Sequence, residues 1–284
     1  MKIDENKPVL LIDMGYMCFY RFNASKTWYR FSHPEEMKEN PTPKWISVDD
    51  FVDKYETMFH KTLSDLVKTY NVPWCNLILC KDCSRKDIWR NSIFSDYKAT
   101  REASHIKSGF DGQDIFKYTH NTLIPKYKEL YNFNYLSVDN AEADDIIAIC
   151  SSFLVNKYNS KIYIVTSDSD YTQLLNNNIK IVDMKMKERI CSEPKKDLWK
   201  KILSGDKSDN IPACYINQNV IFPNKNTRFV KCTPKIILSL MEIDNWITLL
   251  ETNIRDEQHI LNQKLIDFNY IPKHIKENTL KYFI

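Results

Sequence analysis

The sequence predicts an α/β fold with a central, mostly parallel sheet flanked by helices, followed by a small helical subdomain. The first observation behind this prediction is that apolar, strand-like stretches alternate with segments of helical period. The second is that strand signals end near Pro194, after which only helical stretches follow. The third is that 284 residues with 43% hydrophobic side chains suit one large domain with a small appendage. We therefore expect an α/β domain over residues 1–204 and a helical subdomain over residues 205–284.

The first half of the chain contains two predicted strands. Residues 9–13 (VLLID) are typical of a buried strand, and an aromatic, polar stretch without an assigned element follows them. Apolar side chains then repeat on one helical face over residues 49–70. Residues 76–82 (NLILCKD) form the second predicted strand. Residues 84–110 are basic and aromatic without a clean period, and a segment of this length indicates a functional or partly helical region.

The second half of the α/β region repeats the alternation of strand and helix. Its predicted strands cover residues 135–139, 161–168 and 179–184. Its predicted helices cover residues 114–131 and 142–157, with a short one at 171–175. Alternation of this kind favours a parallel sheet with helices on both faces.

Nine carboxylates occur in five short runs, and four of these runs follow or adjoin a predicted strand. The functional crevice of an open α/β sheet lies beyond the carboxyl ends of its strands, so we expect these acids to meet there. Two unit charges about 4 Å apart repel by roughly 4 kcal/mol at an effective dielectric near 20, so a crowd of them needs cations. Mg²⁺ is the first candidate. The predicted ligands are Asp13, Asp82, Glu142, Asp144, Asp145, Asp168, Asp170, Asp206 and Asp209. This pattern predicts a metal-dependent phosphoryl-transfer enzyme.

Each acidic run also has a purely structural interpretation. The acids at 142–145 could stabilise the N-terminus of the helix that follows. One of Asp168 and Asp170 could cap the next helix through an Asx turn, and the other acids could be ordinary turn residues. Glu142 argues for the metal, because it projects onto the predicted buried face with Ile146 and a buried carboxylate requires a partner.

The basic residues gather in two segments, 81–107 and 185–201, although the formal net charge is only +3. Separate acidic and basic segments suit an enzyme that binds both metal and phosphate, but a solvated helix face remains an alternative for either segment. The eight cysteines contain one C-x₂-C, formed by Cys80 and Cys83, so no zinc site is expected. No signal peptide or apolar run of 18 residues is seen, which predicts a cytoplasmic protein with reduced thiols.

Three acidic motifs occur in a specific order: E-A-D-D at 142–145, T-S-D-x-D at 166–170 and G-D-x-x-D-N-I-P at 205–212. In this order they resemble the 5′-nuclease superfamily of flap endonucleases and 5′–3′ exonucleases. Within that superfamily, WRNSIFSDYKATREAS, SDSDYTQL and LIDFNYIP resemble the ribonuclease H group of T-even bacteriophages. The resemblance covers the chain from Val9 to about Tyr282, and it implies a PIN/flap-endonuclease-like fold in which residues 84–110 form a helical arch over the active site.

The resemblance also implies an activity and the residues that perform it. The implied enzyme is a 5′-to-3′ exonuclease and 5′-flap endonuclease that uses two Mg²⁺ ions, or Mn²⁺, and removes RNA primers and adjoining DNA during lagging-strand replication. Its substrates would be DNA and RNA/DNA duplexes, and its partners a single-stranded-DNA-binding protein and a sliding clamp. We expect a monomer that acts in the cytoplasm, or in the host cytoplasm if the protein is viral. The implied catalytic residues are Lys98, Arg101, Asp144 and Asp170, and the implied nucleic-acid contacts near the arch are Arg85, Lys86, Trp89, Arg90, Tyr97, Lys98 and Arg101.

The region after D-N-I-P departs from the superfamily pattern. Ala213 replaces the first glycine of a hairpin that grips duplex DNA in most relatives, and a polar segment, 214–231, follows. Without those glycines the backbone cannot approach phosphate as closely. We therefore expect the duplex contacts to fall to Lys225, Arg228, Lys231 and Lys235.

Two other functions remain open. A non-catalytic nucleic-acid-binding replisome protein on the same fold would predict broken acids or a lost Lys98–Arg101 pair, and neither is seen. A PIN-like ribonuclease that cuts single-stranded RNA would share the core but not the arch or the helical subdomain. For Trp89 and Tyr97, stacking on an unpaired base and packing inside the arch are equally compatible with the sequence.

Overall fold

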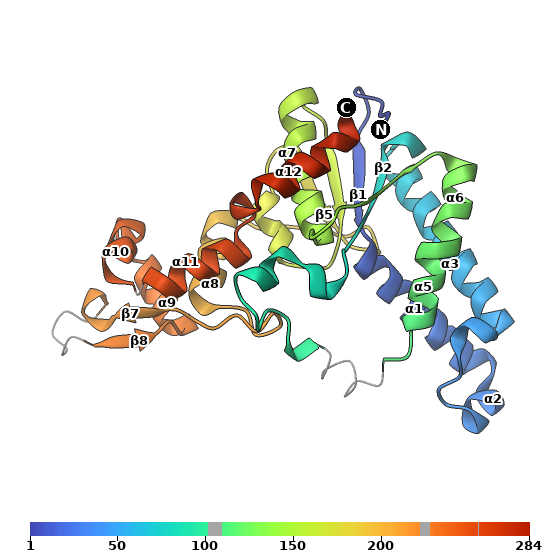
Figure 1. The fold of residues 1–284 in the computed structure, drawn as a ribbon, viewed down its shortest axis with the longest axis horizontal. Helices are drawn as coiled ribbons and strands as arrows, with labels where there is room; N and C mark the ends of the chain where they lie inside the picture. Colours follow the sequence, from blue (N-terminus) through green and yellow to red (C-terminus); the bar gives the residue numbers. More distant parts are fainter. Residues whose placement is uncertain (102–109, 222–227, 255) are drawn as a thin grey trace.

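The computed structural model describes residues 1–101, 110–221, 228–254 and 256–284 (Figure 1). A six-stranded sheet with the order β3-β2-β1-β4-β5-β6 lies at its centre. Strands β1 to β5 pair in parallel with their neighbours, and β6 pairs antiparallel with β5. The predicted α/β class and the mostly parallel sheet are therefore confirmed. The strands are β1 (Val9–Asp13), β2 (Leu77–Lys81), β3 (Asn134–Ser137), β4 (Ile162–Val165), β5 (Ile179–Val182) and β6 (Glu188–Arg189).

The central strands are apolar along their whole length because both faces of the sheet are covered. Leu10 and Ile12 of β1 belong to the core on one face, and Val9 and Leu11 belong to the core on the other. Ile12 pairs with Leu79 of β2 and with Val165 of β4, so the carboxyl ends of these three strands lie level.

The first face of the sheet is covered by the helices on the right of Figure 1. These are α1 (Met14–Ser32), α3 (Asp49–Thr69), α5 (Gln113–Tyr118) and α6 (Ile124–Tyr131), with α2 (Pro34–Glu39) beyond the end of α1 and a π-helical turn (Thr119–Leu123) between α5 and α6. The sequence does not predict α1. The helical period of its apolar residues is irregular, because Phe19 and Phe31 are exposed while Ser25 is buried.

The second face of the sheet is covered by α7 (Ala143–Tyr158) and α12 (Lys273–Leu280), which pack against each other (Figure 1). Ile146 of α7 and Ile275 of α12 are both fully buried in this core. The end of the chain therefore returns to the α/β sheet, although it lies in the predicted C-terminal subdomain. The division at residue 204 stays a prediction.

The rest of the C-terminal part forms a separate core around Leu203, Ile216 and Leu250. Its helices are α8 (Pro194–Ser204), α9 (Pro234–Met241), α10 (Trp246–Asn253) and α11 (Asp256–Ile266). The prediction that no strand follows Pro194 is wrong, because β7 (Tyr215–Asn217) and β8 (Phe229–Lys231) form an antiparallel pair. Strands of three residues are too short for a two-residue period to reveal. None of the described helices combines the length and the apolar composition that crossing a bilayer requires.

Candidate active site

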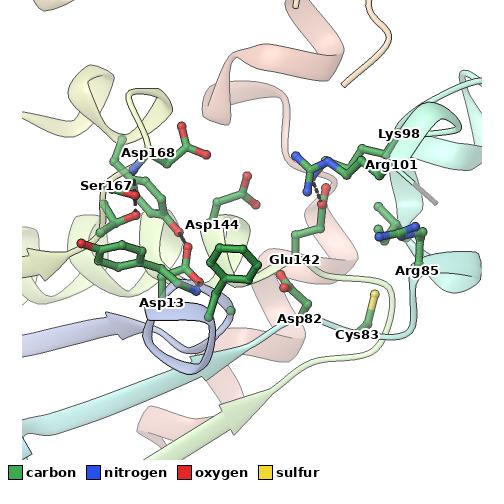
Figure 2. Close-up of a pocket in the computed structure, with 16 residues that line it drawn as sticks. Asp13, Asp82, Cys83, Arg85, Lys98, Arg101, Glu142, Asp144, Ser167 and Asp168 are labelled. Atoms are coloured by element: carbon green, nitrogen blue, oxygen red, sulfur yellow. Dashed lines mark hydrogen bonds and ion pairs between the residues drawn. The ribbon is translucent and has the colours of Figure 1, made fainter. Parts of the chain in front are cut away.

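Five of the predicted metal ligands line one pocket at the carboxyl edge of the sheet (Figure 2). Asp13 ends β1, Asp82 follows β2, Asp168 follows β4, and the other two belong to the start of α7. Arg85, Lys98 and Arg101, from the segment after β2, complete the opposite wall. The pocket therefore presents acids on one side and bases on the other. The five acids are Asp13, Asp82, Glu142, Asp144 and Asp168.

Asp13 accepts hydrogen bonds from two separate segments of the chain. Its Oδ1 accepts a hydrogen bond of 3.1 Å from the Tyr16 backbone N–H, which caps α1, and its Oδ2 accepts one of 3.2 Å from the Tyr171 hydroxyl. Loss of hydration in the pocket, with the nearby Asp82 carboxylate, raises the pKa of Asp13 to about 7. Gly15 keeps this region open, because a Cβ there would lie 3.3 Å from Asp13 Oδ1 and 3.4 Å from Asp82 Oδ2.

Asp82 and Asp144 complete the acidic side of the pocket. Asp82 Oδ1 accepts a hydrogen bond of 2.7 Å from the Ala143 backbone N–H at the start of α7. Loss of hydration raises the pKa of Asp82, and the nearby Glu142 adds to the rise. Loss of hydration also raises the pKa of Asp144 well above its usual range, although Arg90 opposes that rise. Among the described residues, Asp13 and Asp82 have no cationic side chain within ion-pair distance.

Glu142 differs from its neighbours because cationic side chains contact it. Its Oε1 pairs with Lys98 Nζ, and its Oε2 accepts a hydrogen bond of 2.8 Å from Arg90 and one of 3.0 Å from the Tyr97 hydroxyl. Burial by itself would raise the pKa of Glu142, but Lys98 and Arg90 lower it below its ordinary value. Lys98 has a left-handed backbone with φ of 55°, and its N–H donates to the Asp209 carbonyl at 2.9 Å. A strained, tightly held lysine of this kind is typical of a functional site.

A second acidic cluster lies where the C-terminal part meets the sheet. Asp170, Asp206 and Asp209 offer oxygens within 4.8 Å of one another, which is close enough to hold one metal ion. Lys201 of α8 pairs with Asp170 and lies 2.6 Å from Asp206 Oδ2, while Arg101 lies 2.5 Å from Asp209 Oδ1. Loss of hydration, followed by the Asp168 charge, raises the pKa of Asp170 to about 6.

The pKa of Asp206 shifts in the opposite direction from that of Asp170 in the same cluster. Burial opposes its ionisation, but Lys201 and the Ser208 hydroxyl donate hydrogen bonds that lower the pKa of Asp206 to about 2. Gly205 makes the turn before it possible. Its φ is +68°, and a Cβ there would lie 2.3 Å from the Ile211 carbonyl oxygen.

Two models of known protein families together match residues 8–284. The family described as 5′-3′ exonuclease, N-terminal resolvase-like domain matches residues 8–201. The chain belongs to the 5′–3′ exonuclease family. A second family, described as T4 RNase H, C terminal, matches residues 192–284. The resemblance that the three acidic motifs indicated is thus confirmed.

Individual relatives show the extent of the similarity. The ribonuclease H of Enterobacteria phage T4 is 28% identical over 224 residues, 76% of this chain and 72% of that protein. A 5′-3′ exonuclease of Buchnera aphidicola subsp. Schizaphis graminum is 28% identical over 223 residues, 75% of this chain and 67% of that protein.

Two solved structures from bacteriophage T5 share the fold. One is a flap endonuclease crystallised with DNA and metal ions, with a TM-score of 0.58, 15% identity and 97% coverage of both chains. The other is a 5′-exonuclease with divalent zinc ions, with a TM-score of 0.59, 14% identity and coverage of 97% of this chain and 98% of that chain. At these identities they establish the fold of this 5′–3′ exonuclease family member and not its chemistry.

The structure encloses three residues of the 84–110 segment for which the sequence predicts nucleic-acid contacts. Trp89, Arg90 and Tyr97 were expected to contact nucleic acid, but all three are buried. Trp89 and Arg90 bond to Asp145, and the Tyr97 hydroxyl contacts Glu142 and lies 3.2 Å from Asp209 Oδ2. Unlike Lys98, none of the three lines the pocket. For Trp89 and Tyr97, these contacts favour the packing alternative.

The remaining predicted sites have different placements. Asp145 is fully buried and does not line the pocket; its oxygens accept bonds from Arg90, from Trp89 and from the Glu142 backbone N–H. Asp168 lines the pocket and also accepts a 2.9 Å hydrogen bond from the Asp170 N–H, so the Asx turn and the pocket position coexist. Lys86, Lys231 and Lys235 are exposed, Arg228 donates to Gln218 Oε1 at 2.7 Å, and Lys225 lies outside the described residues.

Three residues of the site did not emerge from the sequence. Tyr171 directly follows the T-S-D-x-D motif, and this position was the signal that could have identified it. Lys201 lies in a basic segment that the sequence did show, but its pairing with two acids depends on the tertiary fold. Phe19 lines the pocket with 49% of its surface exposed and stacks on Phe110 at 5.5 Å between ring centroids.

Proposed function

We propose that this chain is a divalent-metal-dependent nuclease that degrades DNA/DNA and RNA/DNA duplexes from their 5′ ends and cuts 5′ flaps. The observation that carries the proposal is the pocket of Figure 2, where five carboxylates face Lys98 and Arg101. Acids that hold metal and bases that hold phosphate are the two components that phosphodiester hydrolysis requires.

The residues of the pocket fit hard divalent cations. Loss of hydration raises the pKa values of Asp13, Asp82 and Asp144, so their ionised forms would gain from a bound cation. Carboxylate oxygens are the ligands that Mg²⁺ prefers, and Mn²⁺ accepts the same set. When bound, such ions supply a more acidic water and stabilise charge on the leaving oxygen. We propose two Mg²⁺ ions, held by Asp13, Asp82, Glu142, Asp144 and Asp168 on one side and by Asp170, Asp206 and Asp209 on the other.

The basic side chains of the arch segment act on the phosphate. Lys98 Nζ lies between Glu142 and Asp209, at 3.8 Å from Asp209 Oδ2, and Arg101 is half-exposed beside the same Asp209. Both line the pocket, where a phosphodiester would carry developing negative charge. Arg85 on the same wall and the exposed Lys86 extend this positive surface. Asp144 and Asp170 are the acids that we expect activity to depend on most.

The biological substrate is proposed from the relatives. One relative is a ribonuclease H, another is a 5′-3′ exonuclease, and a structural neighbour is a flap endonuclease crystallised with DNA. These activities together fit removal of RNA primers and adjoining DNA during lagging-strand replication. Arg228 before β8, Lys231 at the end of β8 and Lys235 in α9 would hold the duplex. We further propose a monomer that acts in the cytoplasm, or in the host cytoplasm for a phage protein, with a single-stranded-DNA-binding protein and a sliding clamp.

The test is cleavage of a flapped DNA duplex labelled at its 5′ or its 3′ end, with Mg²⁺ or with EDTA. The wild type should release 5′-side products only with Mg²⁺, and Asp144→Asn should release none. Asp65→Asn is the matched control, because Asp65 is an exposed acid paired with Lys61 on α3. Tight binding of the flap without cleavage by the wild type would contradict the nuclease and favour a scaffold. Cleavage of single-stranded RNA without a duplex requirement would favour the PIN-like ribonuclease.

A further inference from the structure

Arg90 is an arginine enclosed behind the acidic pocket. It lies in the short 3₁₀ segment Trp89–Ser92, and only 2% of its surface is exposed. Its guanidinium donates to Glu142 Oε2 at 2.8 Å and to the two Asp145 oxygens at 2.9 and 3.0 Å. Its Nε donates to the Leu265 carbonyl oxygen at 2.9 Å, near the end of α11. One side chain thus joins the arch segment, the start of α7 and the C-terminal part.

Asp145 is the counter-ion of Arg90. Besides the paired bonds to Arg90, its Oδ2 accepts a hydrogen bond of 2.9 Å from Trp89 Nε1 and one of 3.1 Å from the Glu142 backbone N–H. A carboxylate that accepts four hydrogen bonds and is fully buried has its charge satisfied by the protein. Glu142 and Asp144, by contrast, line the pocket (Figure 2).

The consequence of this network concerns the orientation of Glu142 and Asp144. Residues 142 and 145 are fixed by the same guanidinium, and Asp144 lies between them in sequence at the first turn of α7. Asp144 Oδ1 is 3.9 Å from Arg90 Nη1, so the positive charge of Arg90 reduces the repulsion between Asp144 and Glu142. The planar fork of an arginine can hold two carboxylates at fixed angles, and a lysine cannot. Groups that orient metal ligands typically change metal affinity by 10–100-fold when they are removed.

We infer that Arg90 is a positioning residue of the metal pocket, which holds Glu142 and Asp144 in the geometry that a divalent ion requires. This inference rests on the proposed metal-dependent function. Arg90 does not touch the substrate; it acts through the two acids. Because it also bonds to Leu265, it couples the position of α11 to the geometry of the pocket.

The test separates positioning from simple support of the fold. Arg90→Met leaves the buried Asp145 carboxylate without its counter-ion, so it should lower both the melting temperature and the affinity for Mn²⁺, measured by isothermal titration calorimetry. The double variant Arg90→Met/Asp145→Leu removes the unpaired charge, so its melting temperature should return toward that of the wild type. Its affinity for Mn²⁺ should nevertheless stay at least about tenfold weaker than that of the wild type, because Glu142 still lacks the hydrogen bond from Arg90.

Two further variants complete the experiment. Arg90→Lys keeps the charge but loses the fork, so it should fold and bind Mn²⁺ about tenfold or more weakly. Arg30→Met, at an exposed position near the end of α1, should bind Mn²⁺ as the wild type does. Wild-type affinity in the double variant or in Arg90→Lys would overturn the positioning role. Absence of Mn²⁺ binding by the wild type would instead overturn the proposed metal-dependent function on which the inference rests.

Discussion

Lys201 Nζ lies 2.6 Å from Asp206 Oδ2, and the same ammonium group pairs with Asp170. A lysine from α8 thus bridges two acids of the second cluster, where we propose that a divalent ion binds. Burial opposes the charge on Lys201, but Asp170 and Asp206 raise its pKa above the ordinary value, so the ammonium is charged at neutral pH. The lysine neutralises part of the repulsion that the cluster would otherwise have.

Replacing Lys201 by methionine should therefore make the stability of the protein more dependent on divalent ions. Without the ammonium, Asp170, Asp206 and Asp209 repel one another, so the melting temperature in EDTA should fall. Addition of Mg²⁺ should restore more of the melting temperature in Lys201→Met than it adds to the wild type. Differential scanning fluorimetry with and without Mg²⁺ measures both quantities. Lys200→Met is the control, because Lys200 pairs with Asp197 on the surface. An equal Mg²⁺ response in both variants would contradict the prediction.

Tyr97→Phe should destabilise the protein by about 1–3 kcal/mol, because it removes the hydroxyl that contacts the buried Glu142 and Asp209. Urea unfolding of the wild type and the variant gives this difference. Tyr282→Phe removes a hydroxyl that donates to the Ser137 carbonyl at an exposed site, so it should change the stability by much less. If the two variants lose the same stability, the Tyr97 hydroxyl does not have the role that its contacts indicate.

Arg101→Ala and Lys98→Ala should separate catalysis from stability. Arg101 is 39% exposed at its side chain, so its removal should lower the single-turnover rate by about 10²–10³-fold with little change in melting temperature. Lys98 is buried against Glu142, so its removal should lower the rate and the melting temperature together. Lys117→Ala, on the exposed surface of α5, serves as the control. Retention of the wild-type rate by Arg101→Ala would exclude Arg101 from the catalytic groups.

His120 should make the folded state sensitive to mildly acidic pH. Burial, with the nearby Lys81, lowers the pKa of His120 from 6.5 to about 4, and its Nδ1 lies 2.9 Å from the Tyr135 hydroxyl. The unfolded chain binds this proton more readily, so the stabilisation is complete above pH 6.5 and is lost as the pH falls toward 4. We expect a loss of about 1–2 kcal/mol, after allowance for the partial exposure of the ring.

The check is the free energy of unfolding at pH 7 and at pH 4.5. His120→Gln should lose less stability than the wild type between these two values, because glutamine does not titrate. His274→Gln, at an exposed position on α12, should keep the wild-type pH dependence. The same pH dependence in His120→Gln and the wild type would show that other groups cause it.

Much of the acidic pocket could be predicted from the sequence because its acids end strands. Asp13, Asp82 and Asp168 follow apolar runs, and parallel strands must place their carboxyl ends at one edge. Glu142 and Asp144 belonged to a motif at a helix start, which the helix signals located within one residue. The helix over residues 14–32 was not predicted, because its exposed aromatic residues mask the helical period.

Strand periodicity and turn positions are local properties, so the fold class and the acids at the sheet edge could be predicted from the sequence. Which charged residues face the pocket and which are enclosed depends on contacts between distant parts of the chain. Arg90 and Arg101 lie in the same basic segment, yet one is buried and the other is half-exposed. The difference arises because the partners of Arg90 are Asp145 and Leu265, which lie 55 and 175 residues away along the chain. No local pattern encodes a contact between residues so far apart in sequence.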